Sequence, residues 1–255
     1  MTISHVRQGA VAWVTLDRPS ALNSLTQELC TQFIEKLGQW RNDAEVRVIV
    51  VTGRGRAFCA GADLKAASER EPGQKDLLDV IVELFDTLRS YPKPVIAAVN
   101  GLAYAGGLEL VLACDLVIAG ESAKFADAHS NFGVFPGGGG AAILPRKIPQ
   151  NVARYLLFTG DPISAVEARH YGLVNEVVPD ADLESRVQGL GDKLSKKSPL
   201  VLANMKAVAN EALDKSVEDA LRHEQLVCRN HQRSYDLSEG LKAFVEKREP
   251  RFKGY

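Results

Sequence analysis

The sequence is poor in the residues that build disulfide frameworks and metal sites. Its 255 residues include two methionines and four cysteines, Cys30, Cys59, Cys114 and Cys228, which form no CxxC pair. Such spacing predicts reduced thiols, and neither a disulfide framework nor a bound metal. No apolar run is long enough to span a bilayer, and the N-terminal stretch lacks the basic and apolar segments of a signal peptide. We therefore expect a cytoplasmic protein with no membrane partner.

An excess of charge of either sign is also missing. The formal net charge is −1, and charged residues make up 25% of the chain. This balance gives no general attraction to nucleic acid or to an anionic membrane surface. One local exception is the C-terminal stretch "GLKAFVEKREPRFKGY", in which five Lys or Arg residues stand against two Glu. We expect no nucleic-acid partner, and a basic patch confined to the C-terminal stretch.

Two familiar nucleotide-binding loops are missing as well. "GRGRAFCAG" begins as GxG after a strand-like run, but Phe58 stands where a dinucleotide-binding loop needs its third glycine. The longest glycine run, "PGGGG" at positions 136–140, follows no strand-like run, and the P-loop pattern does not occur. The sequence therefore gives little support for a Rossmann-type site.

What the sequence does contain is an alternation of strand-like and helix-like segments. The runs "AVAWVTLDRP", "VRVIVVTG", "KPVIAAVNG" and "CDLVIAG" predict buried strands. Apolar residues at helical spacing predict helices around 25–37 and 77–88, and then over 200–213, 217–230 and 237–247. We predict an α/β core over residues 1–195, followed by a helical region over residues 196–255.

Two strand-to-helix junctions carry glycines, "VIVVTGRGRAFCAGADLK" and "PVIAAVNGLAYAGGLELVLA". Glycine lets the backbone approach a ligand closely, and amides at the start of a helix lack partners within that helix. Two such donors that converge on one oxygen would form an oxyanion hole, which stabilises an enolate or a tetrahedral oxyanion. For each junction taken alone, an ordinary turn whose glycines serve packing is the better interpretation.

A single carboxylate, Glu109, lies within the apolar run of the second junction. A buried carboxylate is costly unless it is paired, hydrogen-bonded or neutral. Its position indicates either a structural ion pair or a general acid/base beside the junction.

Five blocks of the sequence, taken together and in order, resemble the enoyl-CoA hydratase/isomerase (crotonase) family. They are "RPSALNSL", "AFCAGADLK", "PVIAAVNGLAYAGGLELVLACDLVIA", "FTGDPISAVEARHYGLVNEVVP" and "FVEKREPRF". The resemblance covers nearly the whole chain. It implies a crotonase-like spiral of ββα turns with a C-terminal helical region that mediates trimers, often stacked as hexamers.

The resemblance also implies a site for the thioester of an acyl-CoA. The oxyanion-hole donors fall on the backbone N–H groups of Ala62 and Gly106. The residues that match CoA-contacting positions of the family are Ala21, Arg56, Ala60, Asp63, Leu64, Lys65, Phe244 and Lys247. The last two often serve a neighbouring subunit. CoA is then part of the substrate, and no separate cofactor is implied; the alternative for Arg56, Lys65 and Lys247 is a solvated surface side chain.

The sequence departs from the family at its second catalytic carboxylate. Glu109 matches one of two glutamates that hydratases use to hold and activate water, but His129 occupies the place of the other. Some isomerases of the family carry an acidic residue at the position of Gly137, and this sequence has no acidic residue there. A His can accept a proton or orient water, since its ordinary pKa is near 6.5; otherwise it only packs at the mouth of the site. Asp127 is a weaker candidate, because its expected register points elsewhere.

These residues predict an acyl-CoA-processing enzyme, foremost a hydro-lyase that reversibly hydrates a 2-enoyl-CoA with Glu109 as general acid/base. Several alternatives stay open on the same oxyanion hole: double-bond isomerisation, thioester hydrolysis and decarboxylation. A CoA-binding or RNA-binding member without turnover is a further alternative. Acyl-chain length depends on loops such as residues 68–75.

Overall fold

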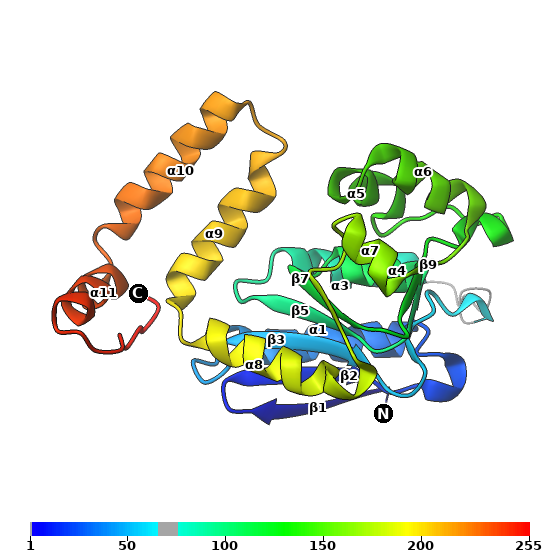
Figure 1. Cartoon of the computed structure of the whole chain (residues 1–255), viewed down its shortest axis with the longest axis horizontal. Helices are drawn as coiled ribbons and strands as arrows, with labels where there is room; N and C mark the ends of the chain where they lie inside the picture. Colours follow the sequence, from blue (N-terminus) through cyan, green and yellow to red (C-terminus); the bar gives the residue numbers. More distant parts are fainter. Residues whose placement is uncertain (1, 66–75) are drawn as a thin grey trace.

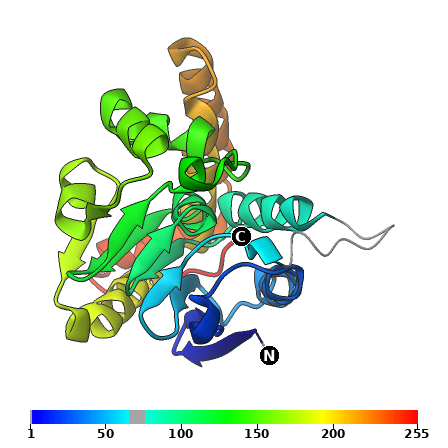
Figure 2. The same cartoon turned by 90° about the vertical axis from the view of Figure 1, so that its right-hand side faces the viewer.

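Two β-sheets form the centre of the fold, and their strands alternate along the chain (Figures 1 and 2). The computed structural model describes residues 2–65 and 76–255, so the loop at 68–75 lies outside the described residues. The larger sheet has six strands, in the order β1 (Ile3–Gln8), β2 (Val11–Leu16), β3 (Val48–Gly53), β5 (Val95–Val99), β7 (Leu116–Gly120) and β10 (Glu176–Val178). Only the β1–β2 pair is antiparallel in it.

The smaller sheet contains the strands β4 (Ala57–Cys59), β6 (Leu102–Tyr104), β8 (Lys124–Ala126) and β9 (Ile163–Ser164). A strand of the larger sheet is followed by one of the smaller sheet in the pairs β3–β4, β5–β6 and β7–β8. Helices come after these pairs: α3 (Leu77–Arg89), α4 (Gly106–Leu112), and α5 (Gly140–Lys147) with α6 (Gln150–Thr159). This is the winding of ββα turns that the resemblance implies.

Strand periodicity divides the core between the two faces of the larger sheet. Val48 and Val50 belong to a cluster that packs against α8 (Leu183–Ser195). Ile49 and Val51 belong to the larger cluster, which also contains the apolar faces of α1 (Gln27–Arg41) and α3. Successive strand residues point to opposite faces, and both faces are covered, which explains why these strands read as continuous apolar runs.

The C-terminal helices extend away from the sheets (Figure 1). They are α9 (Pro199–Ala212), α10 (Val217–His231) and α11 (Tyr235–Val245). Each begins with a serine whose side chain accepts the amide proton of the third helical residue, a cap that stabilises the helix by about 1 kcal/mol. Neither α9 nor α10 buries a residue within the chain. The exposed large apolar side chains of this region are Met205, Leu213, Val217, Leu221, Leu226, Leu241, Phe244 and Val245.

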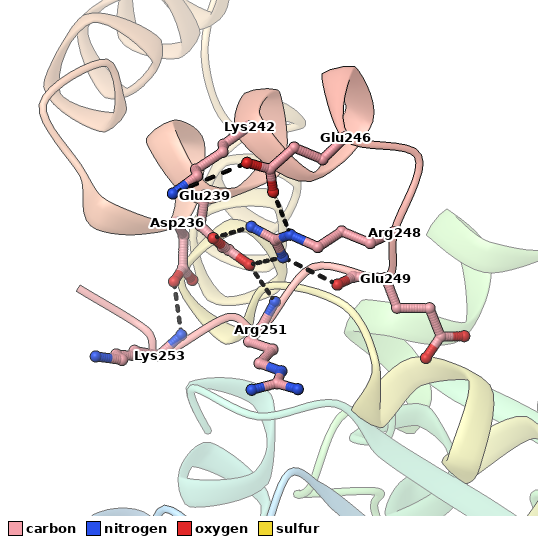
Figure 3. Close-up of polar contacts among 8 residues, drawn as sticks. All are labelled: Asp236, Glu239, Lys242, Glu246, Arg248, Glu249, Arg251 and Lys253. Atoms are coloured by element: carbon pink, nitrogen blue, oxygen red, sulfur yellow. Dashed lines mark hydrogen bonds and ion pairs between the residues drawn. The ribbon is translucent and has the colours of Figure 1, made fainter.

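Two buried carboxylates on α11 tie the last residues of the chain to that helix (Figure 3). Asp236 accepts the amide of Lys253 at 2.7 Å and the hydroxyl of Ser198 at 2.5 Å. Glu239 accepts two hydrogen bonds from the Arg248 guanidinium, at 2.6 and 3.0 Å, and the amide of Arg251 at 2.7 Å. We call these six residues, Ser198, Asp236, Glu239, Arg248, Arg251 and Lys253, the C-terminal knot.

The structure confirms the α/β core, and the four strands and five helices named in the sequence analysis lie where the patterns predicted them, within a few residues. The predicted division at residue 195 falls between the end of α8 at Ser195 and the start of α9 at Pro199; whether the two parts are separate domains stays a prediction. Within the described part of the chain, no helix has both the length and the apolar character needed to cross a membrane.

Candidate active site

Two backbone amides, of Ala62 and Gly106, lie side by side where the two glycine-bearing junctions meet. A Cβ added to Gly61 would lie 3.1 Å from the Gly106 nitrogen, and one added to Gly106 would lie 3.4 Å from the Ala62 nitrogen. Neither amide has a hydrogen-bond acceptor among residues 2–65 and 76–255. Two adjacent amides without partners are the donor pair that an oxyanion site needs.

Backbone strain and close packing hold the second junction in place. Ala105 has a φ of +49° although it is not glycine, a conformation that costs roughly 1–3 kcal/mol. Its amide donates to the carbonyl of Ala126 at 2.9 Å. The next helix, α4, lies so close to β4 that a Cβ on Gly107 would overlap the carbonyl oxygen of Cys59. The Gly106 amide is therefore held rigidly beside that of Ala62.

Glu109 lies one helical turn beyond Gly106, and its side chain is buried. Its Oε1 atom accepts the amides of Gly138 at 2.7 Å and Gly140 at 2.9 Å. Because α5 begins at Gly140, this oxygen lies at the positive end of the helix dipole, which favours a carboxylate. The Oε2 atom accepts no hydrogen bond in the described chain and faces His129, whose Nε2 is 3.9 Å away. One carboxylate oxygen is thus fixed, and the other is available for proton transfer.

His129 is held on its other side by Asp127. The Nδ1 atom of His129 lies 2.9 Å from Oδ1 of Asp127. Strand β8 ends at Ala126, and Ala128 has a left-handed φ of +57°, which turns the chain so that residues 127 and 129 meet. Asp127 is 1% exposed, and its Oδ2 atom is buried without a hydrogen-bond partner in the described structure. The site therefore places an imidazole between two carboxylates.

The negative charges of these two carboxylates affect the pKa of the His129 imidazole. Burial lowers the pKa of His129, but the hydrogen bond to Asp127 and the negative charges of Asp127 and Glu109 together outweigh it. The pKa of His129 therefore lies above the ordinary value of 6.5. The imidazolium form, which can donate a proton from Nε2, is therefore more stable here than in a free histidine.

The backbone of the run "PGGGG" passes close to the carboxylates of Glu109 and Asp127. A Cβ on Gly138 would lie 2.9 Å from Oε2 of Glu109, and one on Gly140 would lie 2.5 Å from Oδ2 of Asp127. The carbonyl of Gly138 accepts a hydrogen bond from Nη1 of Arg89 at 3.1 Å, which fixes the turn from outside. A Cβ on Gly138 would also lie 2.5 Å from the ring of Phe85, so close packing against both the acidic groups and this ring favours glycine here.

Most of the residues assigned to CoA lie beside the paired amides. The loop at 20–25 runs along the segment 60–63, since Ala60 donates its amide to Leu22 at 3.0 Å and Asp63 donates its amide to Leu25 at 2.9 Å. Asp63 also forms an ion pair of 3.0 Å with Arg18. Further residues of this region are Ala21, at the end of a short 3-10 turn, and the exposed Arg56, Leu64 and Lys65.

Phe244 and Lys247 do not lie near this site within one chain. Phe244 is 84% exposed at the end of α11, on the opposite side of the molecule from α4 and α5 (Figure 1). Lys247 follows it in a left-handed conformation, with a φ of +53°, next to the C-terminal knot. A contact of these residues with the substrate would require the site of another subunit.

Comparison with known proteins agrees with the arrangement of sheets and site. The model of the enoyl-CoA hydratase/isomerase family matches residues 6–255. This chain belongs to that family. It is 37% identical over 249 residues to 2,3-dehydroadipyl-CoA hydratase of Escherichia coli, covering 97% of each chain. It is 36% identical over 256 residues to carnitinyl-CoA dehydratase of Proteus mirabilis, covering 97% of this chain and 96% of the other.

Solved structures of the family share the fold throughout. An enoyl-CoA hydratase from Bacillus anthracis superposes with a TM-score of 0.95 at 36% identity, covering 100% of both chains. One from Geobacillus kaustophilus gives a TM-score of 0.92 at 37% identity, covering 100% of this chain and 99% of the other. The crotonase fold is thereby established, and the protein is an enzyme of the hydratase/isomerase type whose family acts on acyl-CoA thioesters.

The expectation that the side chain of Asp127 points away from the site was wrong, since the left-handed turn at Ala128 directs it onto His129. The amides of Gly138 and Gly140 were missed, because the sequence showed only a glycine-rich turn. The sequence held no signal for the contact between Asp127 and His129, because the extended register ends at Ala128, whose left-handed conformation brings residues 127 and 129 together. For the amides there was no signal either.

Proposed function

We propose that this enzyme catalyses the reversible hydration of a 2-enoyl-CoA. The single observation that supports the proposal most strongly is the pair of proton-exchanging atoms, Oε2 of Glu109 and Nε2 of His129, 3.9 Å apart. Glu109 lies one helical turn beyond Gly106, whose amide belongs to the pair suited to a thioester oxygen. A water molecule that contacts both atoms would be oriented for addition to a double bond next to that thioester.

The mechanism follows from the charges of the three groups. In the hydration direction, Oε2 of Glu109 takes a proton from water as the water oxygen bonds to C3. Electrons of the double bond move toward the thioester, and the amides of Ala62 and Gly106 stabilise the enolate oxygen. Nε2 of the His129 imidazolium then donates its proton to C2. Transfer of the proton on Glu109 to His129 restores the starting state, so that one water has been added across the double bond.

In this proposal His129 takes the place of the second glutamate found in hydratases of the family. Isomerisation needs only one shuttling group between C2 and C4 and no water, so it would leave His129 and Asp127 without a role. Hydrolysis would direct the water to the thioester carbon instead of C3. The buried Asp127–His129 pair beside Glu109 therefore favours chemistry that manages water over isomerisation.

We further propose a homotrimer, or a hexamer formed from two trimers, in which the tail of one subunit contacts the CoA of a neighbour. The exposed apolar side chains along α9, α10 and α11 support this, because a surface of that kind is usually covered by a partner. The exposed Phe244 and Lys247 would then meet the substrate of the adjacent subunit. A location in the cytoplasm is the expectation from sequence that we retain with this proposal.

The test is product analysis with the purified oligomer, whose mass is measured by light scattering in the same buffer. The substrates are a short 2-enoyl-CoA, a 3-enoyl-CoA and an ω-carboxylated 2-enoyl-CoA. We expect the 3-hydroxyacyl-CoA from the 2-enoyl esters and no isomerisation of the 3-enoyl ester. Release of free CoA would indicate a hydrolase, and binding of every ester without turnover would contradict the proposal.

A further inference from the structure

Asp127 is buried, but one of its carboxylate oxygens has no hydrogen-bond partner in the described structure, which is unfavourable for a residue that serves stability alone. It is 1% exposed, yet half of its hydrogen-bonding capacity is unused, because Oδ2 has no partner within the described structure. A buried carboxylate oxygen without a donor destabilises the fold, because its lost hydration is not replaced. The space around it is also restricted, since only glycine fits at position 140 beside Oδ2. The side chain of Asp127 forms one hydrogen bond in the described structure, between its Oδ1 atom and Nδ1 of His129 at 2.9 Å.

That contact decides which nitrogen of His129 exchanges protons. A carboxylate accepts hydrogen bonds and does not donate them, so Nδ1 of His129 must carry a proton for the pair to form. The second proton of the imidazolium is then on Nε2, the atom that faces Glu109 at 3.9 Å. The charged groups that bear on His129 are Asp127, at the end of β8, and Glu109, on α4.

We propose that Asp127 is a positioning residue that keeps the Nδ1 proton on His129 and so makes Nε2 the atom that donates to the substrate. This inference rests on the proposed hydration for its role in turnover. The coupling between Asp127 and His129 itself does not depend on which reaction the enzyme performs. It can therefore be measured in the free protein.

The first experiment is an NMR titration of the His129 ring nitrogens in wild type and Asp127→Asn, without substrate. His129→Gln identifies the signal by its loss. We expect the neutral ring of wild type to carry its proton on Nδ1, and the pKa of His129 to be lower in Asp127→Asn, because one negative charge and its hydrogen bond are gone. An unchanged pKa and tautomer in Asp127→Asn would overturn the proposal, whether or not the wild type turns over any enoyl-CoA.

The second experiment measures turnover of a 2-enoyl-CoA against pH. Activity that needs the imidazolium is lost as pH rises through the pKa of His129, so the basic limb of the kcat/KM profile reports that group. In Asp127→Asn we expect this limb to move to lower pH, and kcat to fall by roughly tenfold to a hundredfold with KM little changed. A loss of kcat with an unmoved limb would assign Asp127 a merely structural role.

A double-mutant comparison separates the two roles further. His129→Glu places a carboxylate next to Asp127, where like charges repel, so Asp127→Asn should cause no loss of activity in that background. If Asp127→Asn costs the same factor with His129 and with Glu at position 129, Asp127 acts on the fold and not through the histidine. Circular dichroism and binding of a CoA ester confirm that each variant is folded.

Discussion

This molecule has two pairs of buried carboxylates, Asp236 with Glu239 and Glu109 with Asp127, and the protein surrounds them differently. Helix α11, which carries the first pair, lies far from α4, which carries Glu109 (Figure 1). In the C-terminal knot, every carboxylate oxygen of Asp236 and Glu239 accepts a hydrogen bond. Figure 3 shows those from the Arg248 guanidinium and from the backbone amides of Arg251 and Lys253. The amide of Gly254 and the hydroxyl of Ser198 donate to Asp236 as well.

At the candidate site, Glu109 has one oxygen held by amides and one that accepts no hydrogen bond within the described residues. Asp127 likewise uses one oxygen and leaves the other without a partner.

The difference shows how burial of the same group serves two purposes. A carboxylate whose oxygens are saturated by donors is locked in its charged form, and the Arg248 hydrogen bonds lower the pKa of Glu239 to about 2. Such a group holds the chain together but cannot exchange a proton near neutral pH. At the candidate site, the oxygen of Glu109 without a donor faces Nε2 of His129, and Asp127 holds the other ring nitrogen of that histidine. The half-satisfied pair is therefore the one suited to chemistry.

The largest effect should come from Glu109→Gln, a change of nearly equal shape. The amide oxygen can still accept the amides of Gly138 and Gly140, but no group remains to take a proton from water. We expect kcat for hydration to fall by roughly 10²- to 10⁴-fold, with binding of the CoA ester nearly intact by calorimetry. Normal rates in this variant would remove Glu109 from the mechanism.

Gly140→Ala tests the geometry without removing a charge. The new Cβ would lie 2.5 Å from Oδ2 of Asp127 and 3.4 Å from Oε1 of Glu109, so one of these groups must shift. We expect a loss in kcat/KM of about 10²-fold, which is typical of a small displacement of reacting groups. The matched control is Gly189→Ala on α8, where no atom lies within 4 Å of the added Cβ. That variant should keep full activity, and equal rates in the two variants would contradict the prediction.

Glu239→Gln should have the smallest effect on chemistry and a visible effect on stability. The pKa of Glu239 is lowered from 4.5 to about 2 in the folded protein, so its stabilising contribution is present above about pH 4.5 and is lost as pH falls toward 2. We expect a lower Tm than wild type at neutral pH, a difference that shrinks through this acid range, and an unchanged kcat. Thermal melts followed by circular dichroism measure it.

The control for Glu239→Gln is Glu224→Gln, at an exposed position on α10. It should leave Tm unchanged throughout the pH range. If the difference in Tm between wild type and Glu239→Gln stays constant with pH, the charge of Glu239 does not stabilise the fold.

Much of the core could be predicted from local pattern. The strands β2, β3, β5 and β7 are continuous apolar runs because both faces of the larger sheet are covered. The short strands of the smaller sheet were not predicted, since three residues carry too little periodicity to separate them from a turn. The knot was missed for a similar reason, because the sequence "FVEKREPRF" shows its charges but not which of them meet Glu239.

The sequence by itself determined the family and the glycine-bearing junctions, because these depend on residue types at fixed spacings, and the resemblance to the family singled out Glu109 and His129 as candidates. Only the tertiary structure decided how the groups meet. It brought the amides of Ala62 and Gly106 together from two separate junctions, and it directed two glycine amides onto one oxygen of Glu109. It also turned Asp127 onto His129 through a single left-handed residue. Contacts of this kind depend on backbone angles and on chain segments far apart in sequence, which local residue patterns do not encode.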